Sequence, residues 1–262
     1  MVRLEAITFD LDDTLWDNGG VMRRTEEGHY AWLDAALHEW LEGRMQDRLE
    51  ERLGGHADGA SPSDARGRFA ERFPLAAFIE RRLRLAGAHP LRRGDFTWLR
   101  HRALAELLNE YGLAAEHADH WASRAMERFM VLRHEVTPHE EVDELLDELG
   151  SRYRLASITN GNVEIARLAL GRHFPVAIAA GELLAPKPDP RPFLAALARL
   201  GTPPSRALHV GDSWAEDALP ARRLGMQAAW IGPDDRALPA GIHRLDHVRE
   251  LPALIRWLER QR

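Results

Sequence analysis

The chain has 262 residues, of which 45% are hydrophobic and 29% charged, as expected of a globular protein with one large domain or a domain with an insertion. A formal net charge of -6 argues against general nucleic-acid binding, and no apolar run approaches the length of a membrane span. The absence of cysteine excludes disulfides and thiolate sites. Taken together, these features lead us to expect a cytoplasmic protein with no membrane partner.

The first predicted element is a buried strand, Leu4–Asp10, which ends in acidic residues. Asp10, Asp12 and Asp13 stand where the apolar run stops. Acidic side chains are poor strand formers and are costly to bury without a partner, so packing alone would not select them here. A turn that caps a helix is the structural alternative, since Asp and Thr are common N-caps. A catalytic or metal site is the functional alternative.

A long helical region follows. Apolar residues recur at three- and four-residue spacing over residues 21–53, 69–86, 96–111 and 115–132. The polar, glycine-rich segment Gly54–Gly67 between the first two predicts a loop. Because no strand signal appears in this region, we predict an inserted all-helical cap domain over residues 18–134.

Strands and helices alternate in the rest of the chain. A capping box formed by Thr137, Pro138 and Glu140 predicts a helix over Pro138–Leu149. Further strands are predicted at Arg154–Thr159, Val176–Ala179, Arg206–Val210 and Gln227–Ile231, and further helices at 162–170, 192–200, 216–224 and 248–259. This alternation predicts an α/β fold with a doubly wound parallel sheet, formed by a catalytic core of residues 1–17 and 135–262.

Polar side chains that packing would not demand follow three of the predicted strands. They are Asp10, Asp12 and Thr14, then Thr159 and Asn160, then Asp212 and Ser213. The carboxyl ends of parallel strands lie at one edge of a sheet, so we expect these groups to converge there with Lys187, from a nearby loop.

The residue types in this set favour phosphoryl transfer assisted by a metal ion. Asp10, Asp212 and the backbone carbonyl of Asp12 offer the oxygen ligands that Mg²⁺ prefers. The hydroxyl of Thr159 and the backbone N–H groups that begin at Asn160 would bind phosphate oxygens at the start of a predicted helix.

Lys187 is predicted to bind phosphate as well. It is the only lysine among the 35 Lys and Arg residues, so this chain uses arginine wherever a generic positive charge suffices. An ammonium group is compact enough to contact a carboxylate and a phosphate together. Asp10 could then attack phosphorus to form an aspartyl phosphate, while Asp12 acts as acid and then as base.

The motifs resemble, in order, the four motifs of the haloacid dehalogenase (HAD) superfamily. These are Asp10-Leu11-Asp12-Asp13-Thr14, Thr159-Asn160-Gly161, Lys187-Pro188, and Gly211-Asp212-Ser213 with Asp217. The resemblance implies a HAD-like Rossmannoid core with the helical C1 cap of subfamily I. It also implies Asp10 as nucleophile, Asp12 as acid/base and Mg²⁺ as cofactor, with Thr14, Ser213 and Asp217 supporting the metal site.

Further matches are similar to YigB-type phosphatases of this superfamily. They include Asp17-Asn18, Arg24-Thr25-Glu26, His209-Val210-Gly211-Asp212 and Gly225-Met226-Gln227-Ala228. Such phosphatases act on 5-amino-6-(5-phosphoribitylamino)uracil in riboflavin biosynthesis and on flavin mononucleotide. The resemblance implies a small phosphorylated metabolite as substrate, which Arg24 could contact, and leaves a monomer and a homodimer open.

Three alternatives remain at this point. Haloacid dehalogenases share the nucleophilic Asp10 but lack an acidic residue at the position of Asp12. Phosphomutases share all four motifs. Receiver-like signalling domains carry a phosphorylated Asp with an acidic pair, Thr and Lys, but there the phosphorylated Asp lies on a later strand and no large helical insertion occurs.

Overall fold

The computed structural model describes residues 3–53, 67–233 and 237–261. The predicted loop Gly54–Gly67 lies outside these residues except for Gly67. The chain divides into two compact units, Met1–Val21 with Gly94–Phe96 and His134–Arg262, and Met22–Arg93 with Thr97–Arg133. The predicted domain limits at 17/18 and 134/135 stay a prediction.

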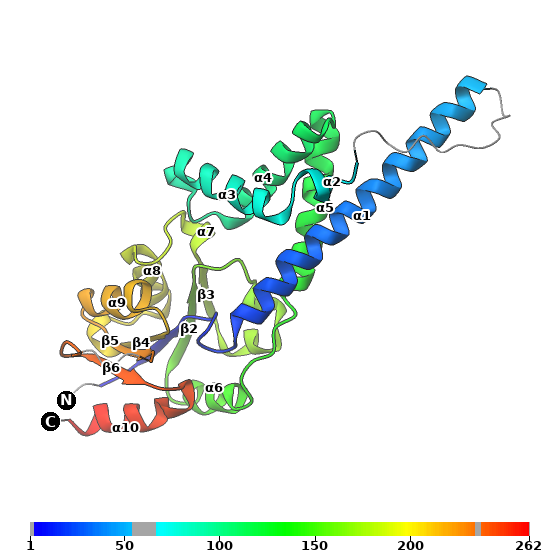
Figure 1. Cartoon of the computed structure of the whole chain (residues 1–262). Helices are drawn as coiled ribbons and strands as arrows, with labels where there is room; N and C mark the ends of the chain where they lie inside the picture. The colour runs from blue at the N-terminus through cyan, green and yellow to red at the C-terminus, as the bar shows by residue number, and fades with distance from the viewer. Residues whose placement is uncertain (1–2, 54–66, 234–236, 262) are drawn as a thin grey trace. The chain divides into compact units, whose positions relative to one another are not determined.

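The first unit is built on six parallel strands in the order β3-β2-β1-β4-β5-β6 (Figure 1). They are β1 (Ala6–Phe9), β2 (Arg154–Thr159), β3 (Val176–Ala179), β4 (Ala207–Gly211), β5 (Gln227–Ile231) and β6 (Ile242–Leu245). The predicted α/β fold with a doubly wound parallel sheet is confirmed. The strand β6 was not predicted, because the polar pair His243-Arg244 at its centre interrupts the apolar pattern. The winding direction reverses between β1 and β4, where ligands bind in such sheets.

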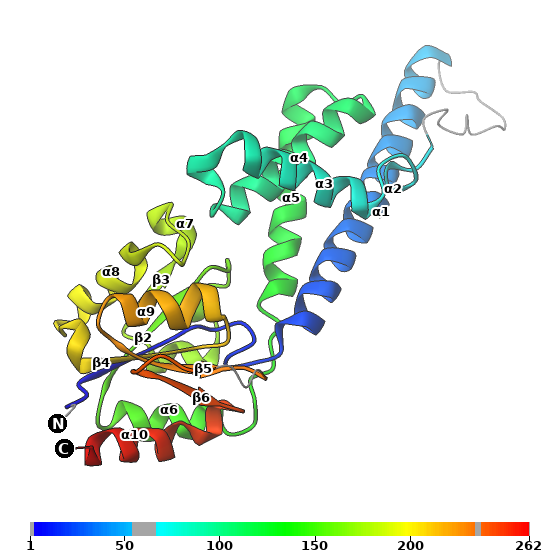
Figure 2. The same ribbon diagram turned by 60° about the vertical axis from the view of Figure 1, so that its left-hand side comes forward.

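Helices cover both faces of this sheet (Figures 1 and 2). On one face lie α6 (Val142–Gly150) and α10 (Leu251–Arg260), and on the other α8 (Pro190–Leu200) and α9 (Leu219–Arg223). Successive strand residues point to opposite faces, so Ile7 and Phe9 of β1 pack with α6 and α10 while Ala6 packs with α8. Burial on both faces explains why three of the four residues of β1 are apolar, instead of apolar residues alternating with polar ones.

Among its described residues, the second unit contains helices and no strand, as expected of a helical cap. Its elements are α1 (Asn18–Leu53, whose first residues belong to the first unit), α2 (Phe69–Arg72), α3 (Leu75–Ala88), α4 (Phe96–Tyr111, from Thr97) and α5 (Ala115–Arg133). Their core includes Leu33, Phe78, Leu104 and Phe129, each fully buried. No described helix in either unit is both long and apolar enough to cross a membrane.

Two predicted helices have different limits because of proline and a long-range hydrogen bond. The predicted helix 69–86 is split into α2 and α3, since Pro74 lacks an N–H group and sits in extended conformation as the N-cap of α3. The predicted helix Pro138–Leu149 begins only at Val142. Before it, the N–H of His139 donates to the carbonyl of Leu15, at 3.0 Å, so this segment is tied to the first motif instead.

Two further predictions near the site differ from the structure, the first in the kind of element and the second only in the form of its first turn. In place of a helix over 162–170 there are two short 3-10 turns, η2 (Ile165–Arg167) and η3 (Ala169–His173). The predicted helix 216–224 is a π turn, η5 (Trp214–Ala218), followed by α9. In η5 the carbonyl of Ser213 accepts from the N–H groups of both Asp217 and Ala218. The wider turn helps to aim Asp217 back toward β4.

Candidate active site

A cavity of about 370 Å³ lies at the carboxyl ends of β1, β2 and β4. It is lined by Asp10, Asp12, Asp13, Thr159, Asn160, Gly161, Lys187, Asp212, Ser213, Glu216 and Asp217. Of the predicted core residues only Thr14 is not in the lining, and its Oγ1 lies 3.5 Å from Oδ2 of Asp10. Arg24 belongs to the second unit, and its contact with substrate stays a prediction.

The loop after β1 is shaped by hydrogen bonds of its own residues. The N–H of Leu15 donates to the carbonyl of Leu11 at 2.9 Å, which folds the loop back under Asp10. Asp13 has a φ of 58°, in the left-handed region that Asp tolerates better than most residues. Its Oδ1 accepts from the N–H of Asn18 at 2.9 Å, at the start of α1. Asp13 therefore has a structural role that accounts for its carboxylate.

Lys187 joins two carboxylates inside the cavity wall. Its Nζ lies 2.6 Å from Oδ1 of Asp10 and 2.5 Å from Oδ1 of Asp217, and all three side chains are buried. Burial raises the pKa of Asp10 far above its usual range, and Lys187 offsets this only in part. For Asp217 burial acts in the same direction, but Lys187 and His209 outweigh it and lower the pKa. Of these two carboxyl groups, Asp217 is therefore the one that stays ionised.

His209 is a buried polar residue that the sequence analysis did not assign to the site. It lies on β4, in register with Thr8 of β1. Its Nε2 is 3.0 Å from Oδ1 of Asp217, and its Nδ1 is 2.8 Å from Oγ1 of Thr8. A carboxylate only accepts, so Nε2 carries the proton and Nδ1 accepts from the hydroxyl of Thr8. Burial lowers the pKa of His209, which keeps the ring neutral.

The hydrogen bonds of His209 predict a graded loss of activity on substitution. His209→Leu leaves Asp217 without its neutral donor, and we expect kcat to fall about 10-fold or more through misplacement of Lys187. His209→Gln keeps a donor for Asp217 and an acceptor for Thr8, so it should retain most of the activity. Steady-state kinetics of the two variants, with thermal unfolding as the check on folding, tests this. Equal losses in both would exclude the role.

The close approach of Asp217 to β4 requires glycine at position 211. A Cβ atom there would lie 2.4 Å from Cγ of Asp217, far inside van der Waals contact. The second oxygen of Asp217, Oδ2, accepts from the N–H of Ser213 at 3.0 Å. Three protein donors therefore hold this carboxylate, which leaves Asp10 and Asp212 as the carboxylates open to another ligand.

The side chain of Asn160 holds the Lys187 loop. Its Nδ2 donates to the carbonyl of Lys187 at 2.9 Å, its Oδ1 accepts from the N–H of Lys187 at 2.7 Å, and Nδ2 also lies 2.9 Å from Glu216. The hydroxyl of Thr159 accepts from the N–H of Gly161 at 2.9 Å and keeps its own hydrogen to donate. No helix starts at Asn160, so the expected contribution of a helix N-terminus to anion binding is wrong.

The donors at the cavity suit a hard divalent cation. Carboxylate oxygens of Asp10, Asp212 and Asp217 lie within 4.8 Å of one another. Burial and the charge of Asp217 raise the pKa of Asp212 to about 6. Lys187 is the only basic residue in a lining that holds six acidic ones, so an anionic substrate needs a further positive charge to enter. Asp10, Asp212 and the carbonyl of Asp12 fit Mg²⁺ by ligand chemistry.

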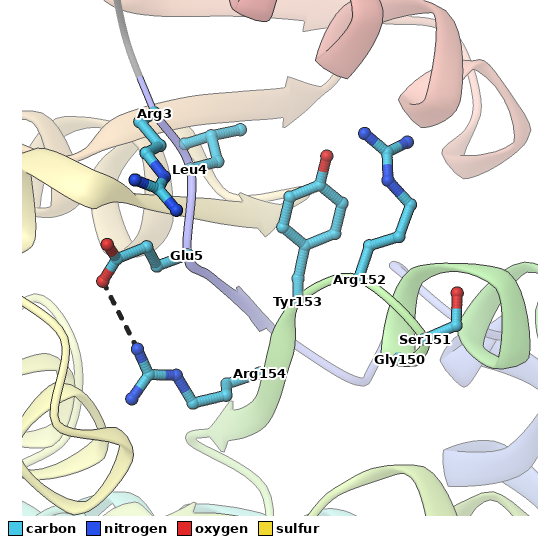
Figure 3. Close-up of a pocket in the computed structure, with 8 residues that line it drawn as sticks. All are labelled: Arg3, Leu4, Glu5, Gly150, Ser151, Arg152, Tyr153 and Arg154. Atoms are coloured by element: carbon cyan, nitrogen blue, oxygen red, sulfur yellow. Dashed lines mark hydrogen bonds and ion pairs between the residues drawn. The ribbon is translucent and has the colours of Figure 1, made fainter.

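A second cavity, of about 470 Å³, opens at the opposite ends of β1 and β2 (Figure 3). Residues Arg3 to Glu5 and Gly150 to Arg154 line it. Arg154 and Arg206 both pair with Glu5, at 3.3 and 2.7 Å, and Arg152 pairs with Glu259 at 3.0 Å. This cavity is open, its lining holds three arginines and one glutamate, and it lies away from the strand ends that carry the motif residues.

Known proteins identify the family of the chain. The family model described as haloacid dehalogenase-like hydrolase matches residues 4–225. The chain belongs to the haloacid dehalogenase-like hydrolases. It is therefore an enzyme, and its Asp10 directly after the first strand, with the large helical insertion, places it outside the receiver-like signalling domains.

The chain is similar to phosphatases and to a protein named as a dehalogenase. The 5-amino-6-(5-phospho-D-ribitylamino)uracil phosphatase YigB of Escherichia coli K12 is 31% identical over 235 residues, 89% of this chain and 85% of YigB. The phosphoserine phosphatase of Thermus thermophilus is 35% identical over 53% of this chain and 55% of its own. A crystal structure named 2-haloacid dehalogenase, from Pseudomonas syringae, is 32% identical with a TM-score of 0.74, covering 97% of this chain and 99% of that one. The predicted similarity to YigB-type phosphatases is confirmed.

Proposed function

We propose that this hydrolase is a Mg²⁺-dependent phosphoric monoester hydrolase that acts on a small phosphorylated metabolite through an aspartyl phosphate at Asp10. The observation that carries the proposal is the presence of Asp12, two residues after Asp10, in the same cavity as Asp10 and Lys187. An alkoxide leaving group must be protonated, and we assign this proton to Asp12. The phosphatase relatives support the same chemistry.

The reaction divides into two displacements at phosphorus. In the first, an oxygen of Asp10 bonds to phosphorus, the bond from phosphorus to the ester oxygen breaks, and Asp12 gives its proton to the departing alcohol. In the second, Asp12 takes a proton from water, whose oxygen attacks phosphorus and releases Asp10 and inorganic phosphate. Lys187 and the hydroxyl of Thr159 donate to the phosphoryl oxygens throughout.

Asp10, Asp212 and the carbonyl of Asp12 would hold Mg²⁺ in this proposal. The bound cation supplies positive charge that favours ionised Asp10 and neutralises the phosphoryl oxygens. The raised pKa of Asp10, which must be ionised to attack, supports the proposed cation. Thr14 donates a hydrogen bond to Asp10, and the N–H of Ser213 donates one to Asp217. Arg24 is proposed to contact the substrate.

For the substrate we propose 5-amino-6-(5-phosphoribitylamino)uracil or flavin mononucleotide, and so a role in riboflavin biosynthesis. The support is the relative YigB, whose match extends over most of both chains. A cytoplasmic location and a monomeric or homodimeric state belong to the same proposal.

A 2-haloacid dehalogenase is the second candidate, because a structure of that name covers nearly the whole chain. Departure of a halide ion needs no proton, so that reaction leaves the acid role of Asp12 unused. A phosphomutase would return the phosphoryl group to a sugar rather than to water.

A substrate panel separates these candidates. The purified protein is assayed for phosphate release from both proposed substrates and from other phosphorylated metabolites, with Mg²⁺ and after chelation, and for halide release from 2-chloropropionate. We expect phosphate release that chelation abolishes and added Mg²⁺ restores. Halide release without phosphate release would establish the dehalogenase, and transfer within a sugar phosphate would establish the mutase.

A further inference from the structure

Asp12 accepts a hydrogen bond from a buried tryptophan that has no place in the four motifs. The indole Nε1 of Trp16 donates to Oδ1 of Asp12 at 2.9 Å. The backbones of these two residues also pair in an isolated bridge. Both lie in the first unit, and Asp12 is half-buried at the cavity while Trp16 is fully buried.

The ring of Trp16 is held by the core beneath the site. It belongs to the apolar cluster that joins β1 to α6 and α10. The preceding residue, Leu15, is fixed by two backbone hydrogen bonds, from its N–H to Leu11 and from the N–H of His139 to its carbonyl. A rigid donor of this kind fixes one carboxyl oxygen in space more firmly than a flexible surface side chain would.

We propose that Trp16 is a positioning residue that holds the carboxyl of Asp12 for proton transfer in both halves of the reaction. This inference rests on the proposed function, in which Asp12 is first an acid and then a base. An indole N–H only donates and does not ionise, so it can keep its bond to Oδ1 in either state of Asp12. With Oδ1 accepting from the indole, the transferable proton is carried on the other oxygen, Oδ2.

The indole N–H is a neutral donor, so this contact brings no charge to Asp12. The other reading is that Asp12 merely satisfies a buried N–H group, as buried donors require. In that reading, loss of the indole changes folding stability but not the response to the leaving group.

Two aryl phosphates of nearly equal size separate the readings. The phenolate of p-nitrophenyl phosphate leaves without a proton far more readily than that of phenyl phosphate, so only the second depends strongly on an acid. We expect Trp16→Phe to lower kcat/KM for phenyl phosphate about 10-fold more than for p-nitrophenyl phosphate, part of the range of general acid catalysis. In an Asp12→Asn background the same substitution should have no effect that depends on the leaving group.

Trp230→Phe is the matched control. Trp230 is also buried at this edge of the sheet, but its indole donates to a backbone carbonyl, that of Asp212, at 2.8 Å. Any loss it causes should be equal for the two esters. If Trp16→Phe fails to fold, β-(3-benzothienyl)alanine placed at position 16 removes the N–H group with almost no change in shape.

The contact has a readout that needs no turnover. In protein labelled with ¹⁵N-tryptophan, the indole signal that Trp16→Phe removes should shift on Asp12→Asn, while the indole signal of Trp230 should not. An equal loss of kcat/KM for both esters, or an indole signal indifferent to Asp12, overturns the inference and leaves the proposed function standing. If the wild type hydrolyses neither ester, the proposed function fails first and the role of Trp16 with it.

Discussion

Asp10→Asn should abolish phosphate release, with kcat falling by about 10⁴-fold or more, as expected when a nucleophile is removed. The amide has nearly the same shape as the carboxyl but lacks the anionic oxygen that attacks phosphorus. Lys187 keeps its bond to Asp217 in this variant, so no buried charge loses its last partner. The fold and the melting temperature should therefore change little.

Asp13→Asn provides the matched control for this variant. Asp13 also lines the cavity, but its carboxylate accepts a hydrogen bond from the N–H of Asn18 at the start of α1. The amide oxygen of asparagine can accept the same bond, and asparagine tolerates the left-handed backbone of this position. We expect this control to keep its activity. Measurable turnover by Asp10→Asn with freshly purified protein would contradict a nucleophilic role for Asp10.

Lys187→Arg should be the second most damaging change, although it preserves the charge. The ammonium reaches Asp10 and Asp217 at 2.6 and 2.5 Å within a buried site, and a planar guanidinium cannot take the same position between them. The phosphoryl oxygens would lose a donor aligned for the transition state. We expect kcat/KM to fall about 10²- to 10³-fold, measured at saturating Mg²⁺.

Two further variants separate the effect of charge from the effect of shape at position 187. Lys187→Met removes the charge, leaves two buried carboxylates without the cation that pairs with both, and should also destabilise the fold by about 3–5 kcal/mol in denaturant unfolding. Arg191→Lys, the reverse exchange at an exposed residue that pairs with Asp189, should change neither activity nor stability. Near wild-type activity of Lys187→Arg would show that only the charge at this position matters.

The motif residues could be placed from the sequence because topology leaves few choices. Once β1, β2 and β4 are parallel neighbours, residues that follow their last positions must share one edge. Asp10, Thr159 and Asp212 therefore line one cavity although many residues separate them. No detail of side-chain packing is needed for this inference.

The supporting residues could not be placed in this way. The partners of His209 are Thr8 and Asp217, and the first is 201 residues away and recognisable only from the strand register. The sequence signal that could have pointed to His209 was the presence of a histidine within a predicted buried strand. Trp16 has the pattern of an ordinary core residue, and the direction of its N–H group depends on the turn made by the loop after β1.

Tertiary hydrogen bonds decided where two of the predicted helices differ from the structure. The capping box at Thr137 was a sound pattern, but the hydrogen bond from His139 to Leu15 competes with helix formation there. At residues 214–218 the helix forms a π turn, from which Asp217 makes hydrogen bonds with Lys187, His209 and Ser213. Tertiary contacts of this kind override propensities that a sequence pattern can measure.

The central claim is a covalent phosphoryl group on Asp10, and chemical trapping tests it most directly. Enzyme quenched during turnover of p-nitrophenyl phosphate is treated with borohydride, which reduces an acyl phosphate to an alcohol, and the peptide containing residue 10 is sequenced by mass spectrometry. We predict homoserine at position 10 in the wild type, and none without substrate. An unmodified Asp10 in enzyme that is turning over, or reduction at another carboxyl, would contradict the account.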